Sequence, residues 1–174
     1  MNTIIENKRI NNPDKIISLQ QEIAQLKNES KVLKEQLKLQ NLALNVSQNS
    51  TVITDNRGSI IWVNKAFTDL TGYTFEEAIN KNPRILKSGI HSTEFYKNLW
   101  DTINSGNAWS GEITNKKKNG SIYHEKLLIS PVQDTNNNIT NFVATKQDIT
   151  LKKHTDDTLN DLYIKYEELA YIFN

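Results

Sequence analysis

An apolar residue recurs at seven-residue intervals through residues 16–44, and this repeat constrains the chain more than any other feature. Two seam positions, three residues apart, are occupied by Ile16, Ile23, Ser30, Leu37 and Leu44 and by Leu19, Leu26, Leu33 and Gln40. Such a heptad pattern is typical of a helix that buries a narrow apolar stripe against another helix. The pattern therefore predicts an N-terminal coiled-coil helix over residues 15–46, paired in parallel with a second copy of the chain.

The seam leaves one alternative open, which is a single amphipathic helix that packs on its own domain. A stripe only two-sevenths of the helix wide favours the dimer. Ser30 and Gln40 weaken the seam but help to fix its register. Residues 1–14 are polar and aperiodic, and we expect them to form a disordered arm.

Residues 47–150 mix the two-residue period of strands with short helical segments. A hairpin is predicted from strands at 51–54 and 59–64, and three later strands at 109–116, 121–132 and 139–148 form a meander. Helices are predicted at 65–70, 75–79 and, after a cap at Ser92 or Thr93, to about residue 103, and Asn82-Pro83 breaks the chain between them. The order predicts an α+β domain with one antiparallel sheet and helices on one face.

Residues 151–174 turn helical again, with a stripe through Leu159, Leu162, Tyr166 and Leu169. A second coiled coil that leaves the sheet is the preferred interpretation, and a helix that caps the domain is the alternative.

Composition excludes several classes of function. The chain has 21 Lys+Arg against 20 Asp+Glu, so it lacks the basic excess of a general nucleic-acid or membrane-surface binder. It has no cysteine, which excludes disulfides, thiolate metal sites and photochemistry that needs a protein thiol. No apolar run is long enough to span a bilayer, and the expected compartment is the cytoplasm. No nucleophile–base pair, metal cluster or phosphate loop is evident, so we expect no enzyme activity from this chain.

Strand alternation directs polar side chains toward the predicted core. Asn115 shares a face with Trp109 and Ile113, and Glu125 shares a face with Leu127. A buried amide or carboxyl is expensive unless it is hydrogen-bonded. Either the two groups bind a ligand, or they satisfy each other, or Glu125 pairs with Lys146 on the last strand.

The chain from about Leu44 to Thr150 resembles a PAS (Per-Arnt-Sim) sensory domain. The resemblance rests on residues 55–89, residues 106–134 and the closing run 142–150, which ends in Asp148-Ile149-Thr150. It implies a five-stranded antiparallel sheet, with a pocket between sheet and helices. It also implies that the helix after Thr150 is a signalling helix.

Within that family the sequence is most similar to the flavin-associated branch. Asn82-Pro83-Arg84 stands where light-oxygen-voltage domains have Asn-Cys-Arg, so the reactive cysteine is replaced by proline. Arg84 matches the arginine that meets the flavin phosphate, and Asn115 matches an asparagine that binds the ring edge. Glu125 and Lys146 replace the second asparagine and the switching glutamine. Trp109-Ser110-Gly111 is similar to the redox-sensing PAS domains of nitrogen-fixation regulators.

The resemblance therefore implies a sensor that binds a small ligand or a non-covalent flavin, FAD before FMN. The implied cofactor-binding residues are Asn82, Arg84, Trp109, Asn115, Glu125 and Lys146. The state of the pocket would pass through dimeric coiled coils to a kinase or cyclase output domain or to a partner signalling protein. A cofactor-free dimerisation and interaction module is the alternative. His91, just before the helix cap at Ser92, is expected to be a loop residue.

Overall fold

The computed structural model describes residues 13–172, which divide into two compact units at Ala43/Leu44. The first unit is most of helix α2 (Pro13–Val46), a continuous helix of 34 residues that begins two residues before the predicted start. Its side chains are exposed, including the apolar seam residues Ile23 and Leu26. The predicted arm lies largely outside the described residues.

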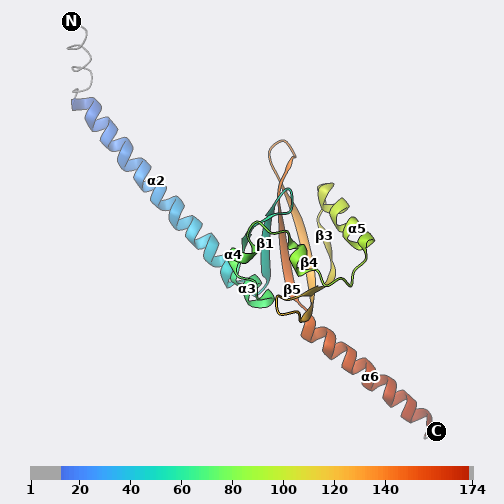
Figure 1. Ribbon diagram of the computed structural model, residues 1–174. Coiled ribbons are helices and arrows are strands. Elements are labelled where there is room, and N and C mark those ends of the chain that lie inside the picture. The colour runs from blue at the N-terminus through green and yellow to red at the C-terminus, as the bar shows by residue number, and fades with distance from the viewer. Residues whose placement is uncertain (1–12, 173–174) are drawn as a thin grey trace. The chain divides into compact units, whose positions relative to one another are not determined.

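The second unit is built on a five-stranded antiparallel sheet, which confirms the predicted fold (Figure 1). The spatial order is β2-β1-β5-β4-β3, so the first and last strands of the domain pair at its centre. The strands are β1 (Ser50–Asp55), β2 (Ile60–Val63), β3 (Trp109–Lys116), β4 (Ile122–Gln133) and β5 (Ile139–Asp148).

Short helices connect β2 to β3. These are α3 (Lys65–Thr71), α4 (Phe75–Ala78), the 3-10 turn η1 (Pro83–Leu86) and α5 (Thr93–Asn104). The Ser92 side chain accepts a hydrogen bond from the Phe95 N–H, so Ser92 is the cap of α5. The turn η1 forms where the sequence predicts only a break, because Pro83 occupies its first position and the Asn82 side chain accepts from the Arg84 N–H.

The core consists of two clusters on the helical side of the sheet. One gathers around Phe67 and Ile60, which α3 and β2 contribute. The other gathers around Leu99, Leu127 and Phe142 and joins α5 to the long strands β4 and β5. These clusters hold the short helices on one face of the sheet, as predicted.

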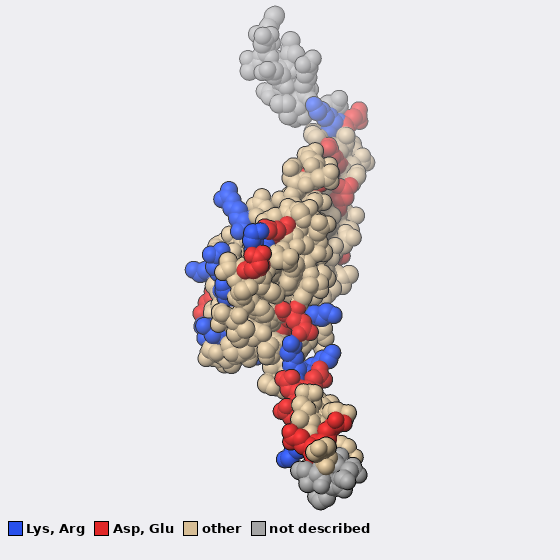
Figure 2. Space-filling view, turned by 90° about the vertical axis from the view of Figure 1, so that its right-hand side faces the viewer, with Lys and Arg blue, Asp and Glu red and all other residues tan. Residues whose placement is uncertain are grey.

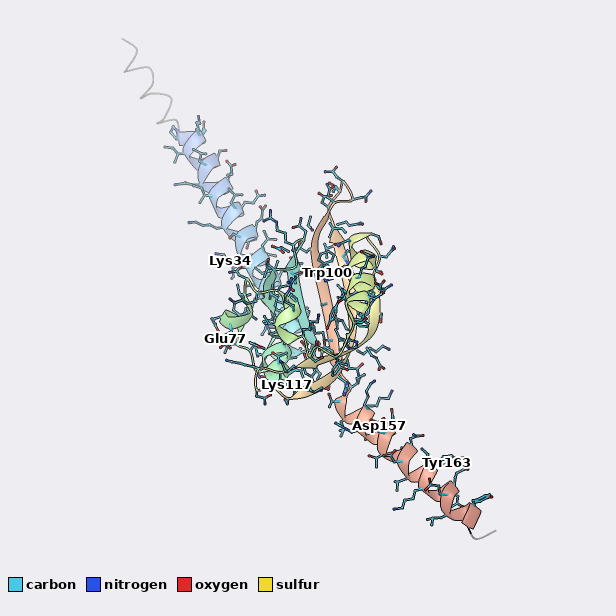
Figure 3. The ribbon with its side chains drawn as sticks, turned by 45° about the vertical axis from the view of Figure 1, so that its right-hand side comes forward. Lys34, Glu77, Trp100, Lys117, Asp157 and Tyr163 are labelled. Atoms are coloured by element: carbon cyan, nitrogen blue, oxygen red, sulfur yellow. The ribbon has the colours of Figure 1, made fainter. Side chains whose placement is uncertain are left out.

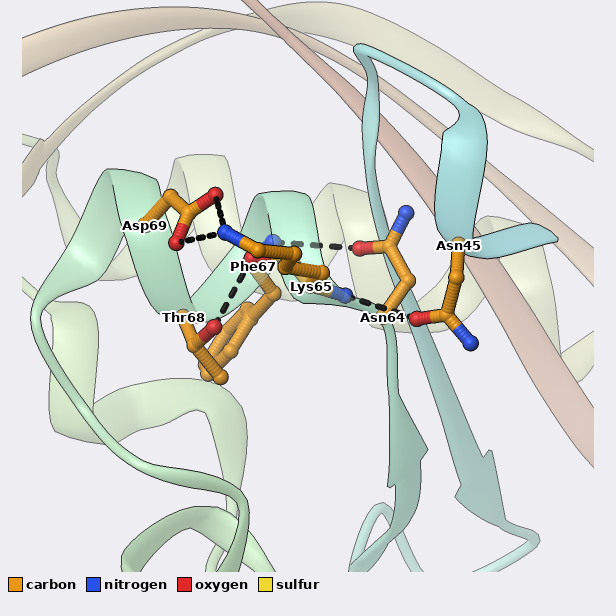
Figure 4. A network of polar contacts seen from close by, with 6 residues as sticks. All are labelled: Asn45, Asn64, Lys65, Phe67, Thr68 and Asp69. Carbon is orange, nitrogen blue, oxygen red and sulfur yellow. Dashed lines mark hydrogen bonds and ion pairs between the residues drawn. The ribbon is translucent and has the colours of Figure 1, made fainter. Parts of the chain in front are cut away.

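Asn64 ties the end of α2 to the sheet. Its Oδ1 accepts from the N–H groups of Thr51 and Phe67, and its Nδ2 donates to the carbonyls of Leu44 and Asn49. Asn64 is 1% exposed, and these four bonds use every hydrogen-bonding position of its buried side-chain amide. Next to it, the Lys65 N–H donates to Asn45 Oδ1, which adds a second bond at the same junction (Figure 4).

Loop segments bind both outer edges of the sheet. At β2, Ile60 donates its N–H to the Lys81 carbonyl and accepts from the Asn80 N–H. At β3, Lys87 forms a β-bridge to Asn115. Both the N–H and the carbonyl of the neighbouring Thr114 are hydrogen-bonded to side chains. The Ser88 hydroxyl donates to the Thr114 carbonyl at 2.5 Å, and His91 Nε2 accepts from the Thr114 N–H at 2.7 Å.

Helix α6 (Thr150–Ile172) follows β5 after one residue. Its start is bonded to the sheet, since Thr150 Oγ1 accepts from the His124 N–H and the Ile149 N–H donates to the His124 carbonyl. Acidic and basic side chains are mixed along it (Figure 2). Among residues 13–172, none of the helices combines the length and the apolar character that a membrane crossing requires.

Candidate functional site

A cavity of about 280 Å³ lies between the sheet and α5. One wall comes from β1, β3, β4 and β5, a second comes from α5, and the segment through η1 borders the cavity as well. Trp100 contributes from α5 (Figure 3), and the Phe142 ring meets it edge to face at 6.1 Å. The lining is mostly apolar, with a few polar groups, which is the usual make-up of a small-molecule site. The polar and charged lining residues are Thr54, Asn82, Arg84, Lys87, Tyr96, Asn115 and Lys146.

Three polar side chains converge on the inner face of β3, β4 and β5. Glu125 is 0%, Lys146 4% and Asn115 5% exposed. Lys146 Nζ lies 3.1 Å from Glu125 Oε1, and Asn115 Nδ2 donates to the same oxygen at 3.0 Å. The predicted inward direction is thus observed, and two of the sequence alternatives hold together, since Glu125 is bonded to Asn115 and to Lys146.

The carboxylate of Glu125 is only half satisfied. Its Oε2 is buried and has no hydrogen-bond partner within the described part of the chain. The hydroxyl of Tyr123, two residues earlier on β4, is buried as well and lies close to Glu125 and Asn115. Burial, and then the negative charge of Glu125, raises the pKa of Tyr123 far above its usual range, so this phenol stays protonated.

The six residues predicted from the resemblance do not share one position. Asn115 and Lys146 line the cavity, whereas Glu125 is not among its lining residues and lies behind them. Asn82 and Arg84 line it from η1, where Asn82 Oδ1 also accepts from Arg84 Nε. Arg84 is exposed, so its guanidinium lies toward solvent rather than in the core.

Trp109 is buried but is not among the cavity-lining residues. Its Nε1 donates to Asn98 Oδ1 at 3.1 Å, and its ring meets the ring of Phe95 edge to face. The indole crosses over Gly111, where an added Cβ would lie only 2.6 Å from Trp109 Cη2. The Trp-Ser-Gly motif therefore has a packing reason, because only glycine leaves room for this ring position.

His91 lies in a loop, as predicted, but it is half-buried and has a definite role there. Its ring stacks on Phe95 with centroids 4.2 Å apart, and Nε2 accepts the Thr114 N–H. Accepting that bond requires a neutral ring. Burial lowers the pKa of His91, which favours the neutral form.

Tyr96 is a cavity-lining residue that the sequence reasoning missed. It shares one face of α5 with Leu99, Trp100 and Ile103, all of which line the cavity. The spacing i, i+3, i+4, i+7 was the available signal, since it aligns a phenol with the inward stripe of the helix.

Comparison with known proteins identifies a family and several similar sequences. The sequence model of the PAS domain family matches residues 48–151. The nitrogen fixation regulatory protein of Klebsiella oxytoca is 31% identical over 118 residues, which cover 67% of this chain and 24% of that protein. A blue-light photoreceptor of Listeria innocua is 31% identical over 131 residues, covering 74% of this chain and 51% of that protein. The chain thus spans a quarter to a half of these relatives.

Among solved structures, an RNA-binding light-oxygen-voltage receptor superposes with a TM-score of 0.66. The match covers 72% of this chain and 36% of that one at 22% identity, so it speaks for the fold alone.

Proposed function

The chain belongs to the PAS domain family, and from this membership we propose that it is the sensory module of a cytoplasmic signal-transduction protein. In this proposal the cavity binds a small ligand, FAD or FMN, without a covalent bond. The state of the ligand then biases helix α6 and, through it, an output partner. The observation that carries the proposal is the mostly apolar cavity with Asn115 and Lys146 on its sheet wall.

The residues present fit the ring system of a flavin. A ring with polar atoms on one edge needs an apolar slot with hydrogen-bonding groups at one end, and Asn115 and Lys146 supply those groups. At the η1 side, the exposed Arg84 guanidinium suits a phosphate. A volume of about 280 Å³ accommodates a ring system, with the remainder of a dinucleotide outside. When bound, a flavin supplies the redox chemistry, and the protein binds and tunes it.

The protein's own contribution is to connect the cavity wall to α6. Lys146 borders the cavity and is held by Glu125, and it lies only two residues before Asp148 at the end of β5. Beyond it, Thr150 is bonded to His124 of β4, and Lys153 pairs with Glu112 of β3 at 2.7 Å. A ligand that changes the bonding of Lys146 therefore acts on the strand that leads directly into α6.

The output belongs to the same proposal. We assign the heptad seam of α2 to a parallel homodimer, because its apolar side chains are exposed in the single chain. The output is a kinase or cyclase domain or a partner signalling protein. The two relatives named above, a regulator and a photoreceptor, support a sensory role of this kind.

The test is reconstitution of the purified chain with FAD and, separately, with FMN. We expect the blue absorption band of oxidised flavin to remain with the protein after gel filtration. Ala144 lines the cavity, so Ala144→Leu should fill it and abolish flavin retention while the chain stays folded. Ala24→Leu, on the exposed surface of α2, is the matched control and should leave retention unchanged. Wild-type protein that retains neither flavin refutes the proposal.

A second function, a cofactor-free interaction module, has one observation in its favour. Asn115 and Lys146 both bond to Glu125, so part of the polar bonding at this wall is supplied by the chain itself. On that reading Ala144→Leu stabilises the chain by filling a void, and wild-type protein binds no flavin. Flavin retention by the wild type, compared with that of Ala144→Leu, therefore separates the two functions.

A further inference from the structure

The hydroxyl of Tyr96 is a buried polar group in need of a partner. Tyr96 lines the cavity from α5, and its phenolic oxygen is sealed from solvent and has no hydrogen-bond partner among residues 13–172. Native proteins leave few buried polar atoms unsatisfied, and each exception calls for an explanation. The ring itself is firmly placed, because the Phe95 and His91 rings meet it edge to face and Lys87 Nζ lies 4.3 Å above its centroid.

The Tyr96 hydroxyl is able to donate a hydrogen bond to a ligand atom. Burial raises the pKa of Tyr96, so the group remains a neutral phenol. A neutral phenol both donates and accepts, and it can rotate its O–H toward a new neighbour. The oxygen exposes almost no surface toward the cavity that Tyr96 borders, so a ligand there reaches it through a small turn of the side chain.

The polar groups of the cavity come from three sides. Asn115 and Lys146 lie on the sheet, Asn82 and Arg84 belong to the segment through η1, and Tyr96 comes from helix α5. Apolar side chains, among them Leu99 and Ile113, line the cavity as well. A ligand that satisfies this arrangement is a ring whose polar atoms can bond to groups on the sheet and on α5 together.

We infer that the Tyr96 hydroxyl is a ligand-contacting group that hydrogen-bonds a polar atom of the bound ring and helps to select it. This inference rests on the proposed function, and it names the helix-side contact of the same site. The hydroxyl makes no hydrogen bond within residues 13–172, and the ligand supplies the missing bond.

The experiment compares Tyr96→Phe with Tyr123→Phe. Both remove a buried hydroxyl, but Tyr123 is not a cavity-lining residue, and its hydroxyl lies beside Glu125 and Asn115 instead. Riboflavin, FMN and FAD are the probes, titrated against flavin fluorescence, and thermal unfolding of the ligand-free proteins is measured in parallel. Riboflavin separates ring contacts from phosphate contacts, because it lacks the phosphate.

We expect Tyr96→Phe to weaken binding of all three probes about tenfold, equivalent to about 1.4 kcal/mol. Its ligand-free form should unfold at the same temperature as wild type or higher, because an unsatisfied group has been removed. Tyr123→Phe should change the affinity for each probe by less than about twofold, because Tyr123 does not line the cavity.

Four other results would overturn the inference about Tyr96. Unchanged affinity in Tyr96→Phe overturns this inference while the proposed function stands. Equal losses of affinity in both variants also overturn it, because the effect then does not depend on lining the cavity. A lower unfolding temperature for ligand-free Tyr96→Phe means that the hydroxyl already has a partner, such as a bound water, and overturns it too. Wild-type protein that binds no probe refutes the proposed function, and the inference falls with it.

Discussion

Replacing Lys146 by methionine tests whether the buried ion pair is held as the structure describes. The substitution keeps the length and much of the volume of the side chain but removes its charge. Glu125 is then left fully buried with a single bond, the one from Asn115 Nδ2. The Tyr123 phenol beside it stays neutral and therefore cannot balance the charge.

The size of the effect follows from the geometry. Breaking a buried ion pair by removing one partner destabilises a protein by about 3–5 kcal/mol, because an uncompensated charge remains inside. Total stabilities are about 5–15 kcal/mol, so Lys146→Met removes a large share. With a urea slope of about 2 kcal/mol per molar, the unfolding midpoint should fall by about 1.5–2.5 M.

The assay is urea unfolding followed by tryptophan fluorescence, applied to a double-mutant cycle. Glu125→Gln alone should also destabilise, since it leaves the Lys146 ammonium unpaired. The double variant Glu125→Gln/Lys146→Met keeps an amide oxygen for Asn115 and has no buried charge. We expect it to be more stable than either single variant, with a coupling energy above about 2 kcal/mol.

Lys97→Met provides the matched control. Lys97 forms an ion pair with Asp101 at 2.5 Å, but both side chains are 63% exposed. Exposed pairs of this spacing are worth less than about 0.5 kcal/mol, so the same chemical change should barely alter the midpoint. If the two single variants of the buried pair add without coupling, or if Lys146→Met is as mild as Lys97→Met, the reasoning is refuted.

Two further predictions concern β3. Burial lowers the folded-state pKa of His91 below its ordinary 6.5, so as pH falls the unfolded chain takes up the proton first. The stability contributed by neutral His91 should therefore be complete above about pH 6.5 and be lost below it. The His91→Gln variant can still accept the Thr114 N–H but does not titrate. In urea unfolding between about pH 5 and 8, it should show a flatter dependence of stability on pH. Identical pH slopes in the two proteins contradict this. Gly111→Ala should cost about 1–3 kcal/mol and shift tryptophan emission, because the new methyl group meets the indole of Trp109. The neighbouring Ser110→Ala, on the exposed face, should change stability by less than about 0.5 kcal/mol, and equal effects at both positions would contradict the packing argument.

The sheet and its polar inner face could be predicted from the sequence because strands have a strict period of two. Trp109, Ile113 and Asn115 alternate with exposed residues, so the inward direction of the amide followed from its apolar neighbours. The same rule directed Glu125 inward from β4. Turn and cap residues such as Ser92 then fixed where the helices begin.

The sequence could not predict how deeply each side chain lies or which way it turns within the site. Periodicity assigns a face to Glu125 but not a depth, and the register of β3, β4 and β5 places its carboxylate behind Asn115 and Lys146. Trp109 illustrates the same limit, because its inward face is correct but its ring turns over Gly111 and away from the cavity. Such positions depend on rotamers and cross-strand neighbours rather than on spacing.

The bonds that loop residues make along β2 and β3 have a consequence for how copies of this chain can associate. A strand with free amide and carbonyl groups is a template on which another chain can build, and such growth leads to swapped or fibrous assemblies. Here the backbone of Ile60 and of Thr114 is already engaged by neighbouring segments. A mutation that frees Ser88 and His91 from Thr114 would therefore open a template for aggregation even where the core is intact.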